Sequence, residues 1–377
     1  MSKIKEVIIL TNPLPSHNES PALSLQKFIS IFPDEFQKIS VVCTNYQNIA
    51  FDISKKPIAI LNVNLKKGPG LIKKGYFHLL SQVKVCQLLR TCNNKNSAVF
   101  FWIADKMIIP FIYCVFKKRQ IYYFLMGNVS NEKAKNSIKS QISRILIRFM
   151  SARSDYVCVE SASVMDQWPS IKRKKNSLII HLFVDVSKFT KVLKIKDRPN
   201  TIGMLTRLAG GKHVIEAIEA FSEWNIKNSS WKLQIIGDGP DRKRCQEIIA
   251  RGNSNIELCG WVDNKKLPDY INQWKILLLP TSAEGLPNSL LECMACGTPA
   301  LTNRIGGIPD VVRHAINGWF LRGTKKEEII RGLDSLPDIE TMELISNNAV
   351  CTVREKYSYS ASCKNIRETI EYVTSRG

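Results

Sequence analysis

Short, continuously apolar runs rich in β-branched and aromatic residues alternate with longer helical patterns through most of the chain. Because these runs are apolar throughout rather than at every second position, they predict strands covered on both faces. Strands separated by helical segments predict parallel βαβ units. The runs lie at residues 7–11, 39–44, 58–63, 98–104, 121–126, 156–160 and 177–182, and then at 201–205, 232–237, 255–260, 276–280 and 299–303.

A chain of 377 residues is long for one hydrophobic core, so two domains are expected. The polar stretch 187–200 divides the two series of strands and is typical of a linker. We expect an α/β protein with two tandem, Rossmann-like, doubly wound parallel sheets facing a crevice, with ligands at the carboxyl ends of the strands. The expected parts are an N-terminal domain at 1–187, a C-terminal domain at 188–357, and a C-terminal helix at 358–377 that packs back toward the N-terminal domain.

No segment predicts a membrane span or a cleavable signal. The longest apolar stretch is interrupted by Asp105 and Lys106, and the apolar run after the N-terminus is too short for a signal peptide. The odd count of 11 cysteines, in a large chain without such a signal, favours reduced thiols. We therefore expect a cytoplasmic protein.

The net charge of +21 is concentrated in the first half of the chain, because residues 1–200 hold 32 Lys/Arg against 12 Asp/Glu. One interpretation is a solvated basic face; the other is a polyanionic partner. Nucleic acid is supported by charge alone, since zinc-finger spacing, an RRM-type signature and a basic zipper are missing. An anionic membrane surface or a phosphate-bearing substrate fits the charge as well.

An amphipathic segment lies within residues 51–150, which hold 18 Lys/Arg against 3 Asp/Glu. One helical face of this segment carries apolar residues, and cations lie outside that stripe: Ile138, Ile142, Ile145 and Phe149 against Lys135, Lys139, Arg144 and Arg148. An ordinary core-packed helix with a basic outer side is one interpretation. The other is reversible docking on anionic lipid, to which Lys73 and Lys74 would contribute.

The stretch TSAEGLPNSLLECMACGTPALTNRIGGIPD (281–310) places Glu284 and Glu292 around a Gly-Leu-Pro corner after a buried strand. Pro287 suits the first turn of a helix that ends near Cys296. Glu284 is then at the carboxyl end of the strand and Glu292 is on the helix. The free N–H groups at the start of this helix form an anion site.

Two of three short patterns near this corner have structural alternatives. Ser289 and Glu292 match a capping box, which would make Glu292 a helix-start residue. Cys293-x-x-Cys296 has redox spacing, but small-residue packing within a helix is the stronger interpretation. The downstream segment GGIPDVV predicts a further glycine turn followed by a helix starting at Pro309.

Arg207 and Lys212 follow the strand at 201–205, in a glycine-containing loop before a helix. Two cations at the carboxyl end of a strand suit a diphosphate, although an isolated pair would more simply be two solvated loop cations. The segment IIGDGP then gives another strand that ends in a glycine-rich turn.

In this order, the motifs resemble the nucleotide-sugar-binding half of retaining glycosyltransferases of family four, which have the GT-B architecture. The resemblance is dense over 200–320 and looser over the N-terminal half. It implies that Arg207 and Lys212 neutralise a donor diphosphate, that Glu284 binds the transferred sugar and that Glu292 binds the ribose. The catalytic set it implies is Glu284, Arg207 and Lys212, and the donor-binding set is Arg207, Lys212, Gly237, Val262, Glu284, Gly285, Leu286, Pro287, Asn288, Ser289 and Glu292.

The resemblance implies transfer of a sugar from a nucleoside-diphosphate-sugar to a glycan or lipid-linked acceptor, in polysaccharide or lipopolysaccharide biosynthesis, at the inner face of the membrane. No D-x-D triplet occurs in the sequence, so we expect no metal and no cofactor beyond the nucleotide-sugar co-substrate. The alternative is a catalytically silent GT-B scaffold or partner subunit.

Two departures from the family pattern concern the N-terminal half. The loop at 12–23 lacks the glycine pair often found there, and its one histidine is His17. Met126-Gly127 stands where family members often carry a histidine. Asp105 is another candidate to face the crevice, with a helix cap as the alternative role.

Overall fold

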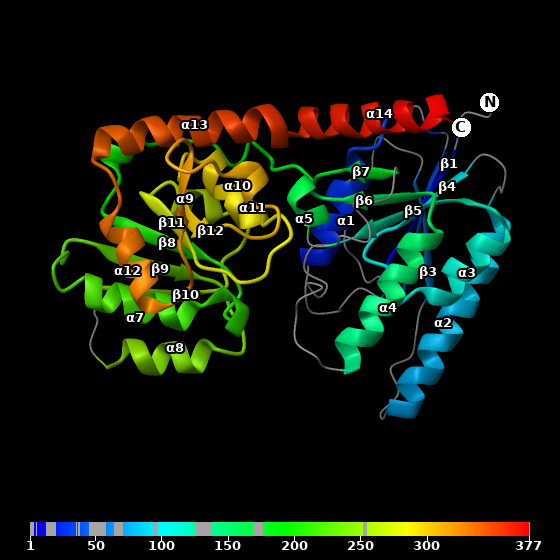
Figure 1. Ribbon diagram of the computed structural model, residues 1–377, viewed down its shortest axis with the longest axis horizontal. Helices are drawn as coiled ribbons and strands as arrows, with labels where there is room; N and C mark the ends of the chain where they lie inside the picture. The colour runs from blue at the N-terminus through cyan, green and yellow to red at the C-terminus, as the bar shows by residue number, and fades with distance from the viewer. Residues whose placement is uncertain are drawn as a thin grey trace. The chain divides into compact units, whose positions relative to one another are not determined.

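The computed structural model describes residues 4, 6–12, 20–34, 36, 38–44, 58–63, 71–92, 97–125, 138–166, 168, 176–251 and 255–376. The chain divides into two compact units, each built on one parallel sheet (Figure 1). Unit 1 comprises Met1–Leu182 together with Ser362–Gly377, and unit 2 comprises Phe183–Ala361. The sequence placed the corresponding divisions at 187/188 and 357/358.

The sheet of unit 1 has seven parallel strands in the order β3-β2-β1-β4-β5-β6-β7. Strand order reverses between the neighbours β1 and β4, which is where a doubly wound sheet leaves room for a ligand. The strands are β1 (Glu6–Leu10), β2 (Lys38–Thr44), β3 (Ile58–Val63), β4 (Ser97–Phe101), β5 (Gln120–Leu125), β6 (Tyr156–Val159) and β7 (Ser177–Ile179).

Helices pack on both faces of this sheet, which explains why its strands are apolar without alternation. Phe28 of α1 packs against Phe100, with ring centroids 5.9 Å apart, whereas Phe111 of α3 packs against Phe101 at 5.2 Å. Successive residues of a strand point to opposite faces, so α1 and α3 cover opposite sides. The helices of unit 1 are α1 (Ser20–Ser30), α2 (Leu71–Thr91), α3 (Ile108–Phe116), α4 (Ile138–Arg153) and α5 (Ala162–Asp166), with most of α14 (Tyr359–Arg376).

The sheet of unit 2 has six parallel strands in the order β10-β9-β8-β11-β12-β13. Here the order reverses between β8 and β11, which pair directly through Ile202 with Ile276 and Gly203 with Leu277. The strands are β8 (Thr201–Leu205), β9 (Lys232–Ile236), β10 (Ile256–Gly260), β11 (Ile276–Leu279), β12 (Ala300–Asn303) and β13 (Gly318–Leu321).

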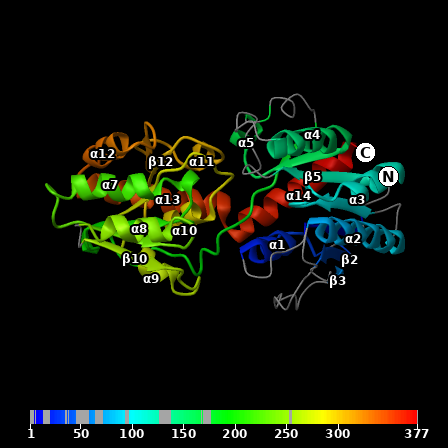
Figure 2. The ribbon, with the colours of Figure 1, turned by 90° about the horizontal axis from the view of Figure 1, so that it is seen from below.

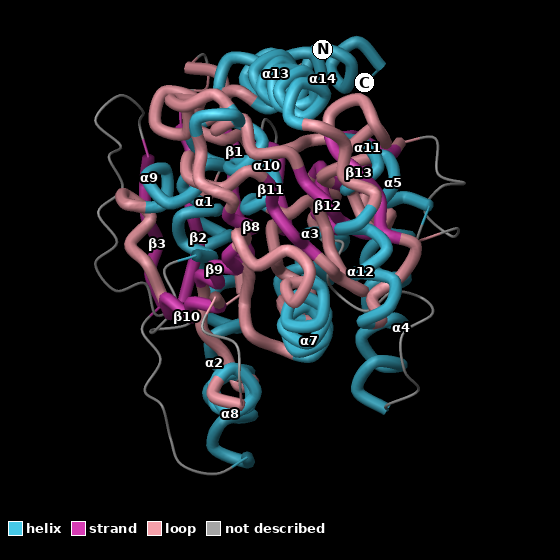
Figure 3. Tube along the Cα trace, turned by 90° about the vertical axis from the view of Figure 1, so that its left-hand side faces the viewer, coloured by secondary structure: helices cyan, strands magenta, loops and turns pink. Residues whose placement is uncertain are grey.

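Two layers of helices enclose the sheet of unit 2. Figure 3 shows α7, α8 and α12 on one face of the sheet and α9, α10 and α13 on the other. The helices are α7 (Val214–Trp224), α8 (Arg242–Ile249), α9 (Leu267–Ile271), α10 (Asn288–Ala295), α11 (Ile308–Val311), α12 (Lys326–Asp334) and α13 (Ile339–Tyr357), with short 3-10 turns η1 (Ile195–Asp197) and η2 (Gly210–Lys212).

The predicted α/β class with two doubly wound parallel sheets is confirmed, and each of the predicted strands overlaps an observed one. Strand β13 was missed, because it has only four residues and begins with a glycine. The run 98–104 was predicted too long, because β4 ends at Phe101 and Ile103 adopts a left-handed φ of 47°.

The prediction of a linker at 187–200 was wrong. These residues belong to unit 2, and Phe189, Ile195 and Arg198 within them are buried. The Arg198 guanidinium donates to the carbonyls of Trp274 and Cys296, both at 2.7 Å. Arg198, one of the polar residues that resembled a linker, therefore fastens this segment to the residues before β11 and to the end of α10.

Candidate functional site

Two loops meet at the carboxyl ends of β8 and β11, the central neighbours of the unit 2 sheet. The loop after β8 carries Arg207 and Lys212, and the loop after β11 carries Glu284. The N–H of Ser282 donates to the carbonyl of Gly211 at 3.1 Å, which ties one loop to the other. Strand order therefore brings together residues that are far apart in the sequence.

Lys212 and Glu284 form an ion pair across these loops. Glu284 is only 8% exposed, so its charged carboxylate needs close hydrogen-bonding or charged partners to offset the cost of burial. Thr281 Oγ1 donates to Glu284 Oε1 at 3.3 Å, and Lys212 Nζ also donates to the carbonyl of Ala283 at 3.4 Å. An ammonium has three donors, and these two contacts account for two of them.

The backbone of the Glu284 loop packs closely against Gly306, and this contact is possible because glycine has no side chain. A Cβ at Gly306 would lie 2.1 Å from the carbonyl oxygen of Glu284, and the residue has a φ of +58°. The next residue, Gly307, donates its N–H to the carbonyl of Gly285 at 2.6 Å. The Gly-Gly turn predicted before α11 is therefore present, and it holds the Glu284–Gly285 backbone in place.

Asn303 is a second support, which the sequence did not reveal. Its side-chain oxygen accepts from the N–H of Thr281 at 2.9 Å, and its amide nitrogen donates to the carbonyl of Gly323 at 2.9 Å. Asn303 ends β12, the neighbour of β11, so this position at the carboxyl edge was its only signal in the sequence.

Helix α10 begins at Asn288 and ends at Ala295, as the corner sequence predicts, with Gly297 in the left-handed region at φ +71°. Its N-cap is Pro287, which lies beside Leu286 in the corner. Ser289 is already inside the helix, so the capping-box interpretation of Ser289 and Glu292 is wrong. The N–H groups of the first turn point out of the helix start, where they favour an anion.

Glu292 lies on α10 and is 8% exposed. The neighbouring thiols of Cys293 and Cys296 are buried, and burial raises the pKa of Cys296 to about 12. Since the thiolate is the reactive form, this pair is unreactive near neutral pH. The structure supports packing, and not redox chemistry, for the Cys-x-x-Cys spacing.

The glycine-rich turn after β9 packs on the loop that carries Arg207. The Arg207 side chain itself is exposed. Gly237 has a φ of +143°, and a Cβ there would lie 1.8 Å from the carbonyl oxygen of Thr206. The N–H of Leu208 donates to the carbonyl of Asp238 at 3.1 Å. The turn thus positions the Arg207 loop, while Val262 is a half-buried residue after β10.

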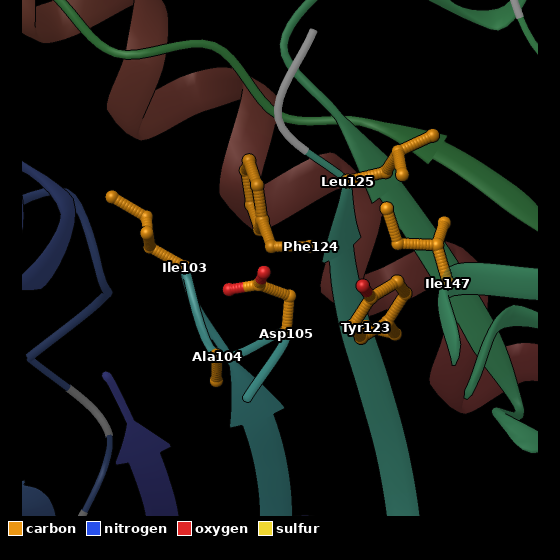
Figure 4. A pocket seen from close by; sticks show the side chains of 7 residues that line it. All are labelled: Ile103, Ala104, Asp105, Tyr123, Phe124, Leu125 and Ile147. Carbon is orange, nitrogen blue, oxygen red and sulfur yellow. The ribbon is translucent and has the colours of Figure 1, made fainter. Parts of the chain in front are cut away.

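A small hollow lies at the carboxyl ends of β4 and β5 in unit 1. In Figure 4 the carboxylate of Asp105 points into the space between Ile103, Phe124 and Tyr123. Asp105 accepts a hydrogen bond from the side-chain amide of Asn12. The alternative role of Asp105 as a helix cap is wrong, because the N-cap of α3 is Met107 and receives no side-chain bond.

His17 and the Met126-Gly127 pair lie outside the described residues, as do the side chains of Lys73, Lys74, Lys139 and Ile138 and the whole of Lys135. Across the described part of the chain, no helix combines the length and the apolar character needed to cross a membrane.

Comparison with solved structures places this architecture in a known fold class. The crystal structure of Anabaena HepE in complex with UDP matches with a TM-score of 0.76 at 16% identity, covering 98% of this chain and 100% of that one. The lipopolysaccharide outer core galactosyltransferase WaaB matches with a TM-score of 0.70 at 16% identity, covering 97% and 99%. The chain has the two-domain GT-B fold.

In sequence, residues 185–349, which lie within unit 2, match the family model of glycosyl transferases group 1. The chain is 27% identical over 188 residues to N-acetyl-alpha-D-glucosaminyl L-malate synthase of Bacillus anthracis, a match that covers 46% of this chain and 48% of that protein. It is 28% identical over 153 residues to the amylovoran biosynthesis glycosyltransferase AmsK of Erwinia amylovora, covering 38% and 37%. The matches to these relatives thus span about half or less of their length.

Proposed function

We propose that this protein is a retaining glycosyltransferase that moves a sugar from a nucleoside-diphosphate-sugar to a glycan or lipid-linked acceptor. The observation that carries the proposal is the ion pair of Lys212 with the buried Glu284 at the strand-order switch of the unit 2 sheet. The glycosyl transferases group 1 match over the same residues supports it. AmsK is an amylovoran biosynthesis enzyme, which favours polysaccharide or lipopolysaccharide assembly as the process.

In this proposal, three positive groups of unit 2 hold the donor diphosphate. Lys212 holds Glu284 with part of its donor capacity and directs the remainder to a phosphate oxygen, Arg207 supplies a second cation, and the first N–H groups of α10 supply aligned dipoles. These groups stabilise the charge that grows on the leaving diphosphate. With them in place, the proposal requires no metal and no further cofactor.

In the reaction, the bond between the anomeric carbon and the β-phosphate oxygen breaks while the acceptor hydroxyl forms the new bond on the same face. The hydroxyl proton passes to the departing phosphate oxygen, so no nucleophile from the protein is needed. Glu284, fixed by Lys212 and Thr281, binds the hydroxyl groups of the transferred sugar. Glu292 on α10 accepts from the ribose hydroxyls.

On the acceptor side, Asp105 binds a hydroxyl group of the acceptor in the unit 1 hollow. Its carboxylate points into that space and is oriented by Asn12, and the carboxyl ends of parallel strands are the usual ligand edge of such sheets. The basic charge of the first half of the chain supports an anionic membrane surface at the inner face of the membrane as the place where the acceptor is met.

The test is calorimetric titration with a panel of nucleoside diphosphates and their sugars, followed by an assay of donor hydrolysis. We expect one nucleoside diphosphate to bind and its sugar to be hydrolysed slowly without acceptor. Binding without any hydrolysis or transfer would favour the silent GT-B scaffold, and failure of the whole panel to bind would refute the glycosyltransferase proposal.

A further inference from the structure

Helices α2, α3 and α4 share a feature that the fold of unit 1 does not require: large apolar side chains on their outer surface. The most exposed are Phe116 at 81%, Ile145 at 64% and Tyr76 at 59%. The exposed apolar residues of these helices, which we call the outer apolar face, are Tyr76, Leu79, Val83, Ile112, Phe116, Ile142, Ile145 and Phe149. Apolar side chains gathered in this way mark a binding surface.

The same stripe recurs on two of the helices. On α2 the exposed residues are Tyr76, Leu79 and Val83, and on α4 they are Ile142, Ile145 and Phe149. Both sets have the spacing i, i+3, i+7, which places each set along one side of its helix. The interpretation of α4 as an ordinary core-packed helix is therefore wrong for this stripe.

The opposite side of each helix faces the core of unit 1. Val85 of α2 and Ile147 of α4 are each 1% exposed and belong to one buried cluster. Burial of the inner side accounts for the packing of the helices on the sheet, whereas most residues of the outer stripes are exposed and do not belong to that core. Their apolar character therefore needs another explanation.

The three helices lie side by side as one layer. Helix α2 contacts α3, and the ring of Phe111 on α3 lies 6.0 Å from that of Phe149 on α4. Figure 2 shows α3 between α2 and α4. The stripes therefore belong to one face of unit 1.

The excess of positive charge on these helices indicates which kind of partner this face binds. Helices α2 and α4 each hold four Lys/Arg, and α2, α3 and α4 together hold no Asp or Glu. Among the cations, Lys84, Lys117, Lys118 and Arg148 are exposed. A surface with apolar stripes and cations of one sign matches the acyl chains and anionic headgroups of a membrane interface.

We propose that the outer apolar face docks on a bilayer of anionic lipid, with its apolar side chains in the interfacial layer and the flanking cations on the headgroups. Nucleic acid would use the cations but gain nothing from the exposed aliphatic residues. An apolar protein partner would not select for a layer free of carboxylates. This proposal rests on the proposed function, because docking would deliver the enzyme to a membrane-held acceptor. The test of docking does not depend on that function.

The experiment is flotation of the full chain with vesicles of neutral phosphatidylcholine or of phosphatidylcholine with about one third phosphatidylglycerol, without nucleotide. The apolar variant carries Tyr76→Ser, Phe116→Ser and Ile145→Ser. Its matched control carries Ile226→Ser and Leu344→Ser, since both residues are exposed and belong to unit 2. The charge variant carries Lys84→Glu, Lys117→Glu and Lys118→Glu.

We expect the wild type and the matched control to bind anionic vesicles and to leave neutral ones largely unbound. The apolar variant should bind at least ~10-fold more weakly at every salt concentration, because the lost contacts are not electrostatic. The charge variant should lose its preference for anionic lipid. Nucleotide affinity, measured in solution on the same proteins, should be the same in the wild type and the variants. If none of these proteins bound nucleotide, that result would contradict the proposed function but not the docking proposal.

Three results would overturn the proposal. One is equal flotation of the apolar variant and its control. Another is self-association of the wild type that the apolar variant abolishes in light scattering, which would assign the face to a second copy. The third is retention on duplex DNA, with no vesicle binding, that the charge variant abolishes.

Discussion

Lys212 pairs with Glu284, two residues that the resemblance assigned to different parts of the donor, the diphosphate and the sugar. Their contact means that the two ends of the proposed donor site are coupled through one ammonium. Neither residue can be changed without altering the surroundings of the other.

The two cations should therefore respond differently to removal. Lys212→Ala and Arg207→Ala should each weaken nucleoside diphosphate binding by about 10-fold or more in calorimetry. Only Lys212→Ala should also lower the melting temperature, because it leaves the buried Glu284 carboxylate unpaired, whereas Arg207 is exposed. Lys356→Ala, at an exposed position on α13, is the matched control. Unchanged affinity in both variants would remove the diphosphate assignment.

The two glutamates should separate the sugar from the ribose. Glu284→Gln should reduce sugar transfer while nucleoside diphosphate affinity stays within a few-fold, because the amide keeps an acceptor for Lys212. Glu292→Gln should weaken nucleoside diphosphate binding itself. Both carboxylates are buried, so affinities are compared per folded molecule after thermal melts. Wild-type affinity in Glu292→Gln would reject the ribose role.

Gly306→Ala should disturb the site without touching any ligand. The new Cβ would overlap the carbonyl oxygen of Glu284, and alanine is strained at a φ of +58°. We expect a loss of stability of about 1–2 kcal/mol and a fall in transfer larger than the fall in folded protein. Gly75→Ala, inside helix α2 where a Cβ would meet nothing within 4 Å, is the control; it should leave transfer unchanged and should not lower stability, because alanine favours a helix more than glycine does. Full transfer activity in Gly306→Ala would show that the Glu284 loop tolerates displacement.

Asp105→Asn should separate acceptor from donor. The substitution keeps the size of the side chain but removes its charge, so the KM for the acceptor should rise while nucleoside diphosphate affinity remains unchanged. Asp34→Asn, at an exposed position in unit 1, is the control. An unchanged acceptor KM would exclude Asp105 from acceptor binding.

Arg198→Ala should destabilise the protein although it lies in a stretch that resembles a linker. The guanidinium is 3% exposed and donates to Trp274 O, Cys296 O and Thr298 Oγ1, each at 2.7 Å. Removing it leaves buried acceptors unpaired, at a cost of about 3 kcal/mol or more in the free energy of unfolding. Arg251→Ala, at an exposed position, should cost little in the same urea titration.

The strands could be predicted because a parallel sheet covered on both faces requires runs such as VIIL and ILLL that few other structures use. The end of β4 could not be predicted, because Ile103 adopts a left-handed φ of 47° that a β-branched residue rarely takes. The residues around it give no signal of this conformation. The stretch 187–200 was misjudged because polar residues that bind buried carbonyls have the same composition as solvated ones.

The candidate site was predictable as residues but not as contacts. Glu284 and Lys212 stood out by their place after strands, but their pairing depends on β8 and β11 being neighbours, which strand order decides. The side-chain oxygen of Asn303 accepts a hydrogen bond from the N–H of Thr281. A single asparagine at the end of a strand does not predict this contact from the sequence.

The membership of Ser362–Gly377 in unit 1 bears on the order in which the protein can mature during synthesis. Unit 2 is one unbroken stretch, Phe183–Ala361, so it can fold as soon as it leaves the ribosome. Unit 1 must wait through the synthesis of all of unit 2 before α14 arrives and the Ser362 hydroxyl can meet His181, 3.2 Å away in the finished protein. The first domain to be made is therefore the last to be completed.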